Sequence, residues 1–238
     1  MHFRWLGTNN SKRYQNGIIF VAGAAIPPQD FLVFIALEGC IGAGKTTVAR
    51  GLAHFRRAQL MEENFELNPF LRAFYSNPGR YALETEFTFL LMHFHQLHDI
   101  VSPGKPLISD FMFDKDLIYA GLNFSGNEEK VIFSDLQKLL ACRLSLPDLV
   151  IFLSVSDELV IERIRKRQRT YELEIDAGYY KRLNEAYETF FQSYERTPLL
   201  RVEADQCDFV KNPSLFASLS KTADEMLVQR RVRASFLL

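Results

Sequence analysis

The chain has 238 residues, of which 47% are hydrophobic and 24% are charged, as is usual for globular proteins; this excludes a disordered or fibrous chain. Its 28 basic residues nearly balance its 29 acidic residues, and the formal net charge is −1. Such a balance gives no general attraction to nucleic acids or anionic membranes, so we expect neither as a partner.

The cysteines and the hydropathy indicate the compartment. Cys40, Cys142 and Cys207 are far apart and odd in number, and they form neither a zinc-binding spacing nor a disulfide framework. No apolar run approaches the roughly 20 residues that a membrane helix needs. We therefore expect a cytoplasmic protein.

The first thirty residues differ from the rest. Residues 1–29 contain no acid, and an apolar stretch at 17–26 ends at Pro27 and Pro28. This order is compatible with an export signal or an organelle presequence, but we favour a poorly ordered extension or a start codon assigned too far upstream. We treat 1–30 as such an extension and 31–238 as one domain.

Short apolar runs alternate with helical patterns through the rest of the chain. The expected strands are 31–37, 58–63, 106–110, 149–155 and 199–203. The expected helices are 46–56, one starting at Asn68-Pro69, 81–100, 113–123, 127–145, 157–169, 177–195 and 213–230. This alternation predicts an α/β fold in three layers, a parallel five-stranded sheet with helices on both faces.

A phosphate-binding loop follows the first strand. Residues 39–46 read Gly-Cys-Ile-Gly-Ala-Gly-Lys-Thr and match G-x-x-x-x-G-K-[ST] in full, between a buried strand and a helix. The glycines let backbone N–H groups point at phosphate oxygens, and the helix adds its positive end. Lys45 then reaches the β- and γ-phosphates, while the Thr46 hydroxyl is suited to Mg²⁺. The loop predicts a P-loop NTPase-type fold that binds a nucleoside triphosphate.

From about Phe31 to its end, the chain resembles the deoxynucleoside kinase family, in particular its bacterial members. The likeness lies in residues 37–47, 62–71, 74–82 and the basic stretch 163–169. The resemblance implies ATP-dependent phosphorylation of a deoxynucleoside 5′-hydroxyl, with ATP and Mg²⁺ as cofactors. It also implies a homodimer built from long helices such as 81–100.

The resemblance implies roles for individual residues. It places the catalytic base at Glu63, with Glu62 as the neighbouring alternative, and the sugar contact at Tyr75, for which a core aromatic is the rival interpretation. Lys45, Arg163 and Arg167 are the remaining catalytic candidates. The expected ATP contacts are Gly39, Cys40, Ile41, Gly42, Ala43, Gly44, Lys45, Thr46, Thr47, Arg167, Arg169, Asp208 and Phe209. Arg163, Arg167 and Arg169 belong to a short basic lid. Because so many positive charges repel one another, this lid favours binding of an anion such as a phosphate.

The third strand departs from the family pattern. The family carries Glu-Arg-Ser at its end, whereas residues 109–111 read Ser-Asp-Phe. Asp110 is the only acid there and becomes, with Thr46, the candidate Mg²⁺ ligand, directly or through water. The missing arginine removes one positive charge unless Lys115 or the lid supplies it.

The expected base pocket departs as well. Glu86 stands where the family often has glutamine, and His93 and Lys115 stand where it has an arginine and an aspartate. An ionised Glu86 only accepts hydrogen bonds, which suits the two adjacent donors of guanine, and Lys115 suits its O6. This favours a purine, with a lean toward deoxyguanosine; the rival is that Glu86 and Lys115 pair with each other. The family's acid for the 3′-hydroxyl falls near Gly178, so either Asp176 replaces it or Tyr75 acts alone.

Other interpretations remain open at this stage. A thymidylate-type nucleoside monophosphate kinase shares the loop and the lid, and a protein that binds nucleotide without transfer fits the missing Glu-Arg-Ser. The cluster of His93, His95, His98 and Asp99 has too few helix-compatible ligands for a metal.

Overall fold

The computed structural model describes residues 33–98, 105–169 and 176–229, together with four strands at 13–15, 18–21, 24–26 and 233–236. Asp99 and the end of the helix predicted at 81–100 therefore lie outside the described residues.

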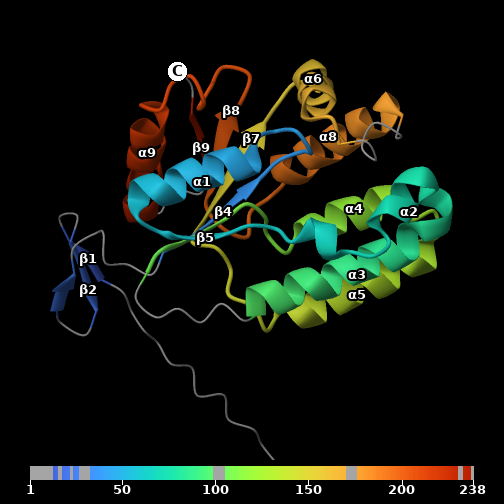
Figure 1. Ribbon diagram of the computed structural model, residues 1–238. Helices are drawn as coiled ribbons and strands as arrows, with labels where there is room; N and C mark the ends of the chain where they lie inside the picture. Colours follow the sequence, from blue (N-terminus) through green and yellow to red (C-terminus); the bar gives the residue numbers. More distant parts are fainter. Residues whose placement is uncertain are drawn as a thin grey trace, which may run out of the picture.

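A parallel sheet forms the centre of the structure (Figure 1). All five predicted strands are present: β4 (Phe34–Glu38), β5 (Gln59–Met61), β6 (Leu107–Ser109), β7 (Leu149–Ser154) and β8 (Leu199–Glu203). Their order is β5-β6-β4-β7-β8, and all neighbours run parallel. A sixth strand that the sequence analysis did not predict, β9 (Arg233–Phe236), adds to the edge beside β8.

The burial of the middle strands β4 and β7 explains why their sequences are continuous apolar runs that could be predicted as strands. Every residue of β7 is buried, and β4 is buried from Ile35 to Glu38. A parallel strand covered on both faces needs apolar side chains in both directions, which gives a continuous run instead of an alternation. In β4 and β7, Ile35 pairs with Leu149 and Leu37 with Ile151.

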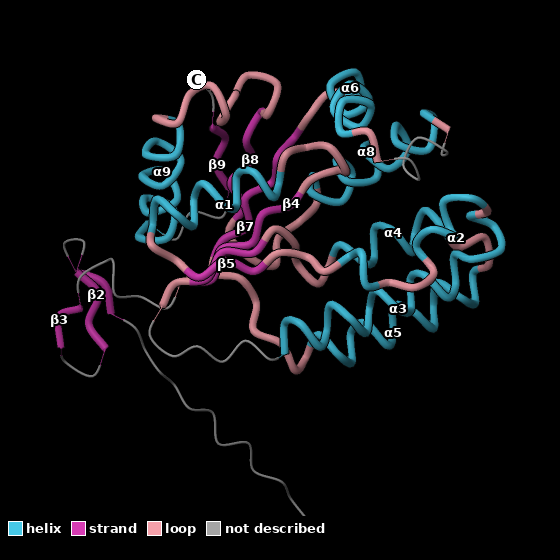
Figure 2. The backbone as a smooth tube through the Cα atoms, in the orientation of Figure 1, coloured by secondary structure: helices cyan, strands magenta, loops and turns pink. Residues whose placement is uncertain are grey.

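Helices alternate with the strands, as Figure 2 shows. Their bounds are α1 (Lys45–Arg56), α2 (Leu71–Ser76), α3 (Pro78–His98), α4 (Lys115–Asn123), α5 (Asn127–Ala141), α6 (Asp157–Arg167), α8 (Ala177–Gln192) and α9 (Leu215–Gln229). The helix expected at 81–100 begins earlier, at Pro78, because proline is well suited to the first helical position. The helix expected to start at Asn68-Pro69 begins at Leu71.

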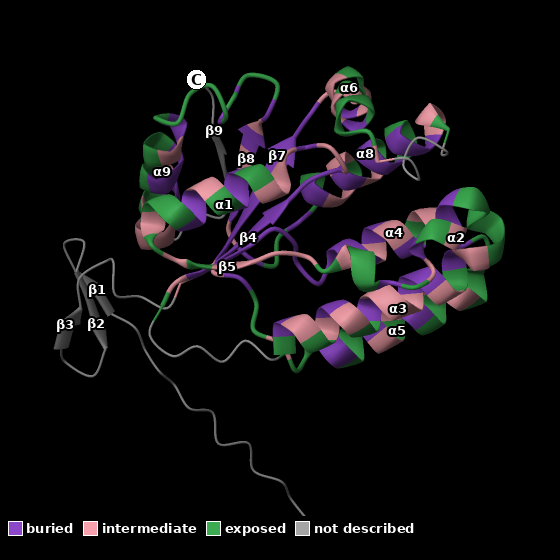
Figure 3. Cartoon of the chain, in the orientation of Figure 1, coloured by how far each residue is buried: buried purple, intermediate pink, exposed green. Residues whose placement is uncertain are grey.

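The helices pack in layers around the sheet, and their buried faces point inward (Figure 3). Helix α1 contacts β4, β5 and β6 as well as α9. Helix α8 packs on β7, where the rings of Phe191 and Phe152 stack with centroids 4.3 Å apart, and it also contacts α4 and α6. Helices α3, α4 and α5 contact one another. This is the predicted three-layer arrangement.

The segment at the N-terminus holds three short strands, β1 (Arg13–Gln15), β2 (Ile18–Val21) and β3 (Ala24–Ile26), which form an antiparallel sheet of their own. Across the described part of the chain, no helix combines the length and the apolar character needed to cross a membrane.

The direction of the strands positions the functional residues. Residues 39–44 follow β4, Glu62 and Glu63 follow β5, and Asp110 follows β6. The carboxyl ends of parallel strands lie at one edge of the sheet, which is where open α/β sheets bind their ligands. The segments that carry the predicted chemistry therefore meet at that edge.

Candidate active site

A cleft of about 920 Å³ runs along this edge. It begins at residues 41–48, passes Glu63 and Asp110, and continues between Tyr75, Glu86 and His93. Residues 207–211, after β8, and the basic end of α6 complete its wall. The cleft is large enough to hold two small molecules whose reacting ends meet near Glu63.

The phosphate loop has the backbone that its glycines permit. Gly39, Gly42 and Gly44 have φ values of 151°, 85° and 101°, which other residues rarely adopt. A Cβ on Gly39 would lie 2.7 Å from the carbonyl oxygen of Leu153, so the loop passes too close to β7 for any side chain there. Residues 41–47 line the cleft; Gly39 and Cys40 lie outside its lining.

Two cations hold the loop. The Lys45 Nζ donates to the carbonyl oxygens of Gly39 at 2.7 Å and Cys40 at 3.2 Å, and burial together with the nearby Lys115 lowers its pKa. Arg163, from α6, donates to the carbonyl oxygens of Gly42 and Ala43 at 3.3 and 2.9 Å. The first residue of the lid therefore already contacts the phosphate loop.

Thr46 and Asp110 meet at the mouth of the cleft. The Thr46 hydroxyl donates to Asp110 Oδ2 at 2.5 Å, and the backbone N–H of Glu63 donates to Asp110 Oδ1 at 2.8 Å. A hydroxyl and a carboxylate are oxygen ligands of the kind that Mg²⁺ takes beside substrate phosphates. The residues that the sequence analysis proposed as metal ligands are thus adjacent, and their chemistry fits the ion.

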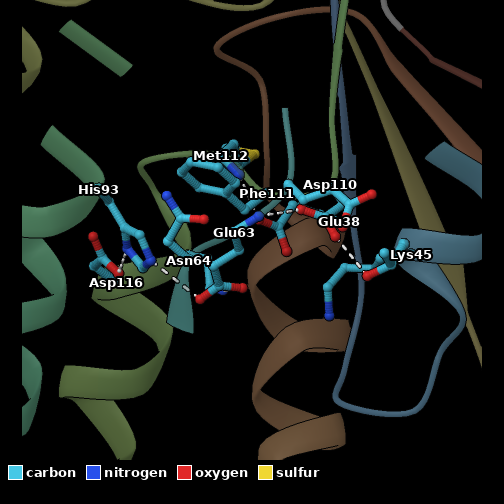
Figure 4. Close-up of polar contacts among 12 residues, drawn as sticks. Glu38, Lys45, Glu63, Asn64, His93, Asp110, Phe111, Met112 and Asp116 are labelled. Atoms are coloured by element: carbon cyan, nitrogen blue, oxygen red, sulfur yellow. Dashed lines mark hydrogen bonds and ion pairs between the residues drawn. The ribbon is translucent and has the colours of Figure 1, made fainter. Parts of the chain in front are cut away.

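Glu63 lies between Lys115 and His93; Figure 4 shows the contact with His93. Its Oε2 accepts from Lys115 Nζ at 2.5 Å, and its Oε1 accepts from His93 Nε2 at 3.1 Å. Burial alone would raise the pKa of this carboxyl, but Lys115 and His93 outweigh it and hold the pKa well below its usual range. Glu63 is therefore a buried anion at neutral pH.

His93 connects Glu63 to a second acid. Its Nδ1 bonds Asp116 Oδ1 at 2.8 Å, and both side chains are 2% exposed. Burial opposes protonation of the imidazole, but Asp116 and Glu63 together raise the pKa of His93 to about 9. Similarly, burial would lower the pKa of Lys115, yet Glu63 and Glu38 raise it above its ordinary value. Two cations and two anions therefore alternate in one chain of contacts.

Glu38, directly before the phosphate loop, is fully buried. Its carboxylate accepts the N–H groups of Gly39 at 3.2 Å and Met112 at 2.7 Å, and it therefore joins the start of the loop to the segment after β6 (Figure 4). Burial raises the pKa of Glu38 to about 7, although Lys115 and Lys45 oppose this.

Glu62, the alternative base, has different surroundings. It receives two hydrogen bonds from the Arg50 guanidinium, at 2.5 and 2.6 Å, in a pair that is largely open to solvent. Its backbone oxygen accepts from Gln96. The geometry therefore brings Glu63, not Glu62, together with Lys115 and His93.

Tyr75 and Glu86 line the far end of the cleft. Tyr75 is buried, with 7% of its surface exposed, so it belongs to both the core and the cleft wall. Glu86 accepts from Asn123 Nδ2 at 2.7 Å, whereas Lys115 bonds Glu63. The alternative that Glu86 and Lys115 pair with each other is wrong, because the α4 lysine bonds the carboxylate of Glu63 instead. Both residues line the cleft.

The lid and the loop after β8 surround the other end. Arg163, Lys166, Arg167 and Arg169 line the cleft, and the Arg169 guanidinium lies 4.6 Å from the ring centre of Phe65. Asp208 and Phe209 line it as well. Asp208 accepts the N–H groups of Val210 and Lys211, while Phe209 is buried against Phe216.

Asp176 lines a smaller, adjoining cavity that Tyr75 also lines. It caps α8 by accepting the N–H of Gly178 at 3.0 Å, and it lines this second cavity, of about 390 Å³, instead of the main cleft. Of the two candidates for the sugar 3′-hydroxyl, only Tyr75 lines the main cleft. The described histidines form no cluster of three or more potential metal ligands with nearby acids or cysteines.

The sequence analysis missed Asp116 and Asn123. A signal for both was present, because Asn123 follows Asp116 by seven residues, which is two turns of α4 and the same face. Glu86 and His93 have the same spacing on α3. Their partners across the helices depend on tertiary packing, which the spacing does not give.

Comparison with known proteins decides between the interpretations. A sequence model of the deoxynucleoside kinase family matches residues 35–228. The chain belongs to the deoxynucleoside kinase family. This match favours a deoxynucleoside kinase over the thymidylate-type kinase and over a binding protein without transfer. The enzyme phosphorylates a deoxynucleoside at the expense of ATP.

Individual deoxynucleoside kinases resemble the chain over most of their length. It is 34% identical over 204 residues to deoxyguanosine kinase of Bacillus subtilis, covering 82% of this chain and 98% of that one. It is 30% identical over 207 residues to deoxyadenosine kinase of Lactobacillus acidophilus, covering 81% and 95%. A solved structure of deoxyadenosine kinase from M. mycoides with bound dCTP has a TM-score of 0.70 and 26% identity, covering 81% of this chain and all of that one.

The contact between His93 and Asp116 makes a testable prediction. Replacing Asp116→Asn keeps an acceptor but removes its negative charge, so burial gains weight and the pKa of His93 should fall from about 9 by about one unit or more. The ring signals of ¹³C-labelled histidine, followed by NMR through a pH titration, give this value. Asp135→Asn, an exposed acid on α5, is the control and should leave it unchanged. An unshifted His93 in Asp116→Asn would contradict the assignment.

Proposed function

We propose that the enzyme transfers the γ-phosphoryl group of ATP to the 5′-hydroxyl of a purine deoxynucleoside, and that Glu63 accepts the hydrogen bond of that hydroxyl. The observation that carries the proposal is the ionised Glu63 carboxylate, which lies in one cleft between the phosphate loop and the Tyr75–Glu86 end. The relatives named deoxyguanosine kinase and deoxyadenosine kinase support a purine substrate.

Glu63 has the capacity for this task. A carboxylate offers about four lone-pair directions, and Lys115 and His93 occupy two of them. The hydroxyl can therefore bond Glu63 without displacing either cation. Because the pKa of Glu63 is held low, its main contribution is to orient the hydroxyl for in-line attack and to accept its proton as the bond to phosphorus forms.

Positive charge around the transferred group completes the site. Phosphoryl transfer depends on positioning and on neutralising the charge of the transferred group. Lys45 and Arg163 contact the loop itself, and Arg167 and Arg169 line the cleft. Lys115 lies beside Glu63 and supplies the charge that the family's missing arginine would provide.

Thr46 and Asp110 would hold Mg²⁺, which neutralises charge on the β- and γ-phosphates when it is bound. Tyr75 would contact the sugar, and Asp208 with Phe209 would contact the adenine of ATP. The second role is supported by their position at the phosphate-loop end of the cleft.

A panel of substrates tests the proposed reaction. With ATP and Mg²⁺, the enzyme should convert deoxyguanosine and deoxyadenosine to their 5′-monophosphates, measured by chromatography, with higher kcat/KM than for deoxycytidine and thymidine. Formation of diphosphates from monophosphates would indicate the thymidylate-type reaction instead. Tight ATP binding without any product would exclude transfer activity.

The role of Glu63 gives a sharper prediction. Glu63→Gln should lower kcat by about 100-fold or more, because the hydroxyl loses its charged acceptor, while ATP binding measured by calorimetry should change little. The matched control is Glu62→Gln, one residue away and bonded to Arg50, which should retain kcat within about threefold. Equal losses in the two variants would argue against Glu63 as the acceptor.

We further propose that the enzyme is a homodimer, that residues 31–238 form its catalytic unit with 1–30 as an extension, and that it acts in the cytoplasm, where ATP is available. The surface of α3 and α5 supports the dimer. Helices α3 and α5 lie side by side (Figure 1) and expose large apolar side chains. These are Leu83, Leu91, Val131, Ile132 and Leu139, each 44% to 61% exposed. Exposed apolar side chains on two neighbouring helices favour burial against a second copy.

Disruption of this face tests the dimer. The double variant Ile132→Glu/Leu139→Glu places two charges one above the other on α5, since the residues are seven apart, and should give a monomer by light scattering coupled to size-exclusion chromatography. Phe55→Glu, on an equally exposed position of α1, should keep the oligomeric state of the unmodified chain. A monomeric unmodified chain would refute the proposal.

A further inference from the structure

Glu86 is a buried acid without a cation. It lies on α3, is 2% exposed, lines the cleft and forms no ion pair within the described part of the chain. Among the described residues, its hydrogen-bond partner is the neutral amide of Asn123. The nearby cations are committed elsewhere, since Lys115 bonds Glu63 and His93 bonds both Glu63 and Asp116.

An ionised carboxylate is costly in such a place. Removing a charge from water without a counter-ion is so unfavourable that the group takes up a proton instead. The groups that face Glu86 are His93 on α3, Lys115 and Asp116 on α4, and the Tyr179 hydroxyl on α8. Burial raises the pKa of Glu86 to about 8; Asn123, His93 and Lys115 oppose this, and Asp116 reinforces it.

We propose that Glu86 contacts the nucleobase as a neutral carboxylic acid, and that Asn123 is the positioning residue that turns the hydroxyl of this acid toward the base. Near neutral pH the pocket then accepts both adenine and guanine. When Glu86 ionises, the pocket favours guanine. The inference rests on the proposed function of the cleft. It also replaces the expectation that Glu86 reads guanine as an anion.

The Asn123 contact fixes where the proton lies. Because the Asn123 Nδ2 donates to Oε1 at 2.7 Å, Oε1 is an acceptor, and the proton of the neutral acid belongs on Oε2. The acid then offers a donor at Oε2 beside an acceptor at Oε1, which retains a second lone pair. A neutral glutamate in this position presents the same pattern as a glutamine.

The two purines respond differently to this pattern. Adenine presents a ring-nitrogen acceptor next to an amino donor on either of its edges, so it matches the donor and acceptor of the neutral acid. When Glu86 is ionised, the lone pair of the adenine ring nitrogen faces a carboxylate oxygen that has no proton to donate. Guanine presents O6 next to N1–H, which matches the neutral acid, and N1–H next to its 2-amino group, which matches the carboxylate. Ionisation of Glu86 therefore removes a partner for adenine and keeps one for guanine.

The experiment measures kcat/KM for deoxyguanosine and for deoxyadenosine between pH 7.0 and 8.5, below the pH at which guanine N1 ionises. The ratio of the two constants cancels titrations that affect both reactions equally, such as those of His93 or ATP. Since kcat/KM reports the free enzyme, a group with a pKa of about 8 should raise the ratio about fourfold over this range.

Three variants separate Glu86 from other causes. In Glu86→Gln, which offers the same donor and acceptor but does not titrate, the ratio should stay constant with pH. In Asn123→Ala, the loss of a hydrogen bond that lowers the pKa should move the midpoint of the ratio to higher pH. The control Glu185→Gln, an exposed acid on α8, should reproduce the fourfold rise.

A constant ratio in the unmodified enzyme, or an equal rise in Glu86→Gln, would overturn the inference. Infrared difference spectra between the unmodified chain and Glu86→Gln give a readout without turnover: a carboxylic-acid carbonyl band should be present at pH 7 and absent at pH 10. Absence of that band at pH 7 would also overturn the inference. If the carboxylic-acid band is present at pH 7 but neither purine deoxynucleoside is phosphorylated, Glu86 is neutral as inferred. The proposed reaction would then be refuted, and with it the recognition of the base by Glu86.

Discussion

The contact between Glu63 and its two cations is the interaction on which the site depends. A carboxylate as deeply buried as Glu63 remains ionised only because Lys115 and His93 touch both of its oxygens. Each cation is in turn stabilised by acids, His93 by Asp116 and Lys115 by Glu38 through its charge. Loss of one member leaves an unpaired charge in the core, so these residues form one unit.

Glu63 and Glu86 show how a single cleft gives two acids opposite states. Both line the same cavity; the Glu63 side chain is 15% exposed, and Glu86 is 2% exposed. Glu63 contacts two cations, whereas Glu86 contacts a single amide. The difference in partners, together with the deeper burial of Glu86, therefore separates the acid proposed to face the reacting hydroxyl from the acid proposed to face the base.

Local patterns account for what the sequence could predict. The strands β4 and β7 and the loop at 39–46 were predictable because a buried strand, a run of glycines and a following helix are encoded by adjacent residues. Strand β9 was missed, since it gains its place only by pairing with β8. At the site, the structure brings the predicted residues Glu63, Tyr75 and Thr46 to one cleft, whereas the rival interpretation that Glu86 pairs with Lys115 was wrong. Lys115 has several acids within reach after folding, and only tertiary packing of α3 on α4 decides which one it bonds.

The position of the Lys45 ammonium bears on how the two proposed substrates would share one cleft. Its Nζ is held by two carbonyl oxygens, of Gly39 and Cys40. These are neutral acceptors, and a ligand must offer anionic oxygens to draw the ammonium away from them. A nucleoside that carries no phosphate lacks such oxygens, so it gains little by entering the donor end of the cavity. In the proposed reaction, the hydrogen bonds of Lys45 to the loop would therefore favour a phosphorylated ligand at this end of the cleft.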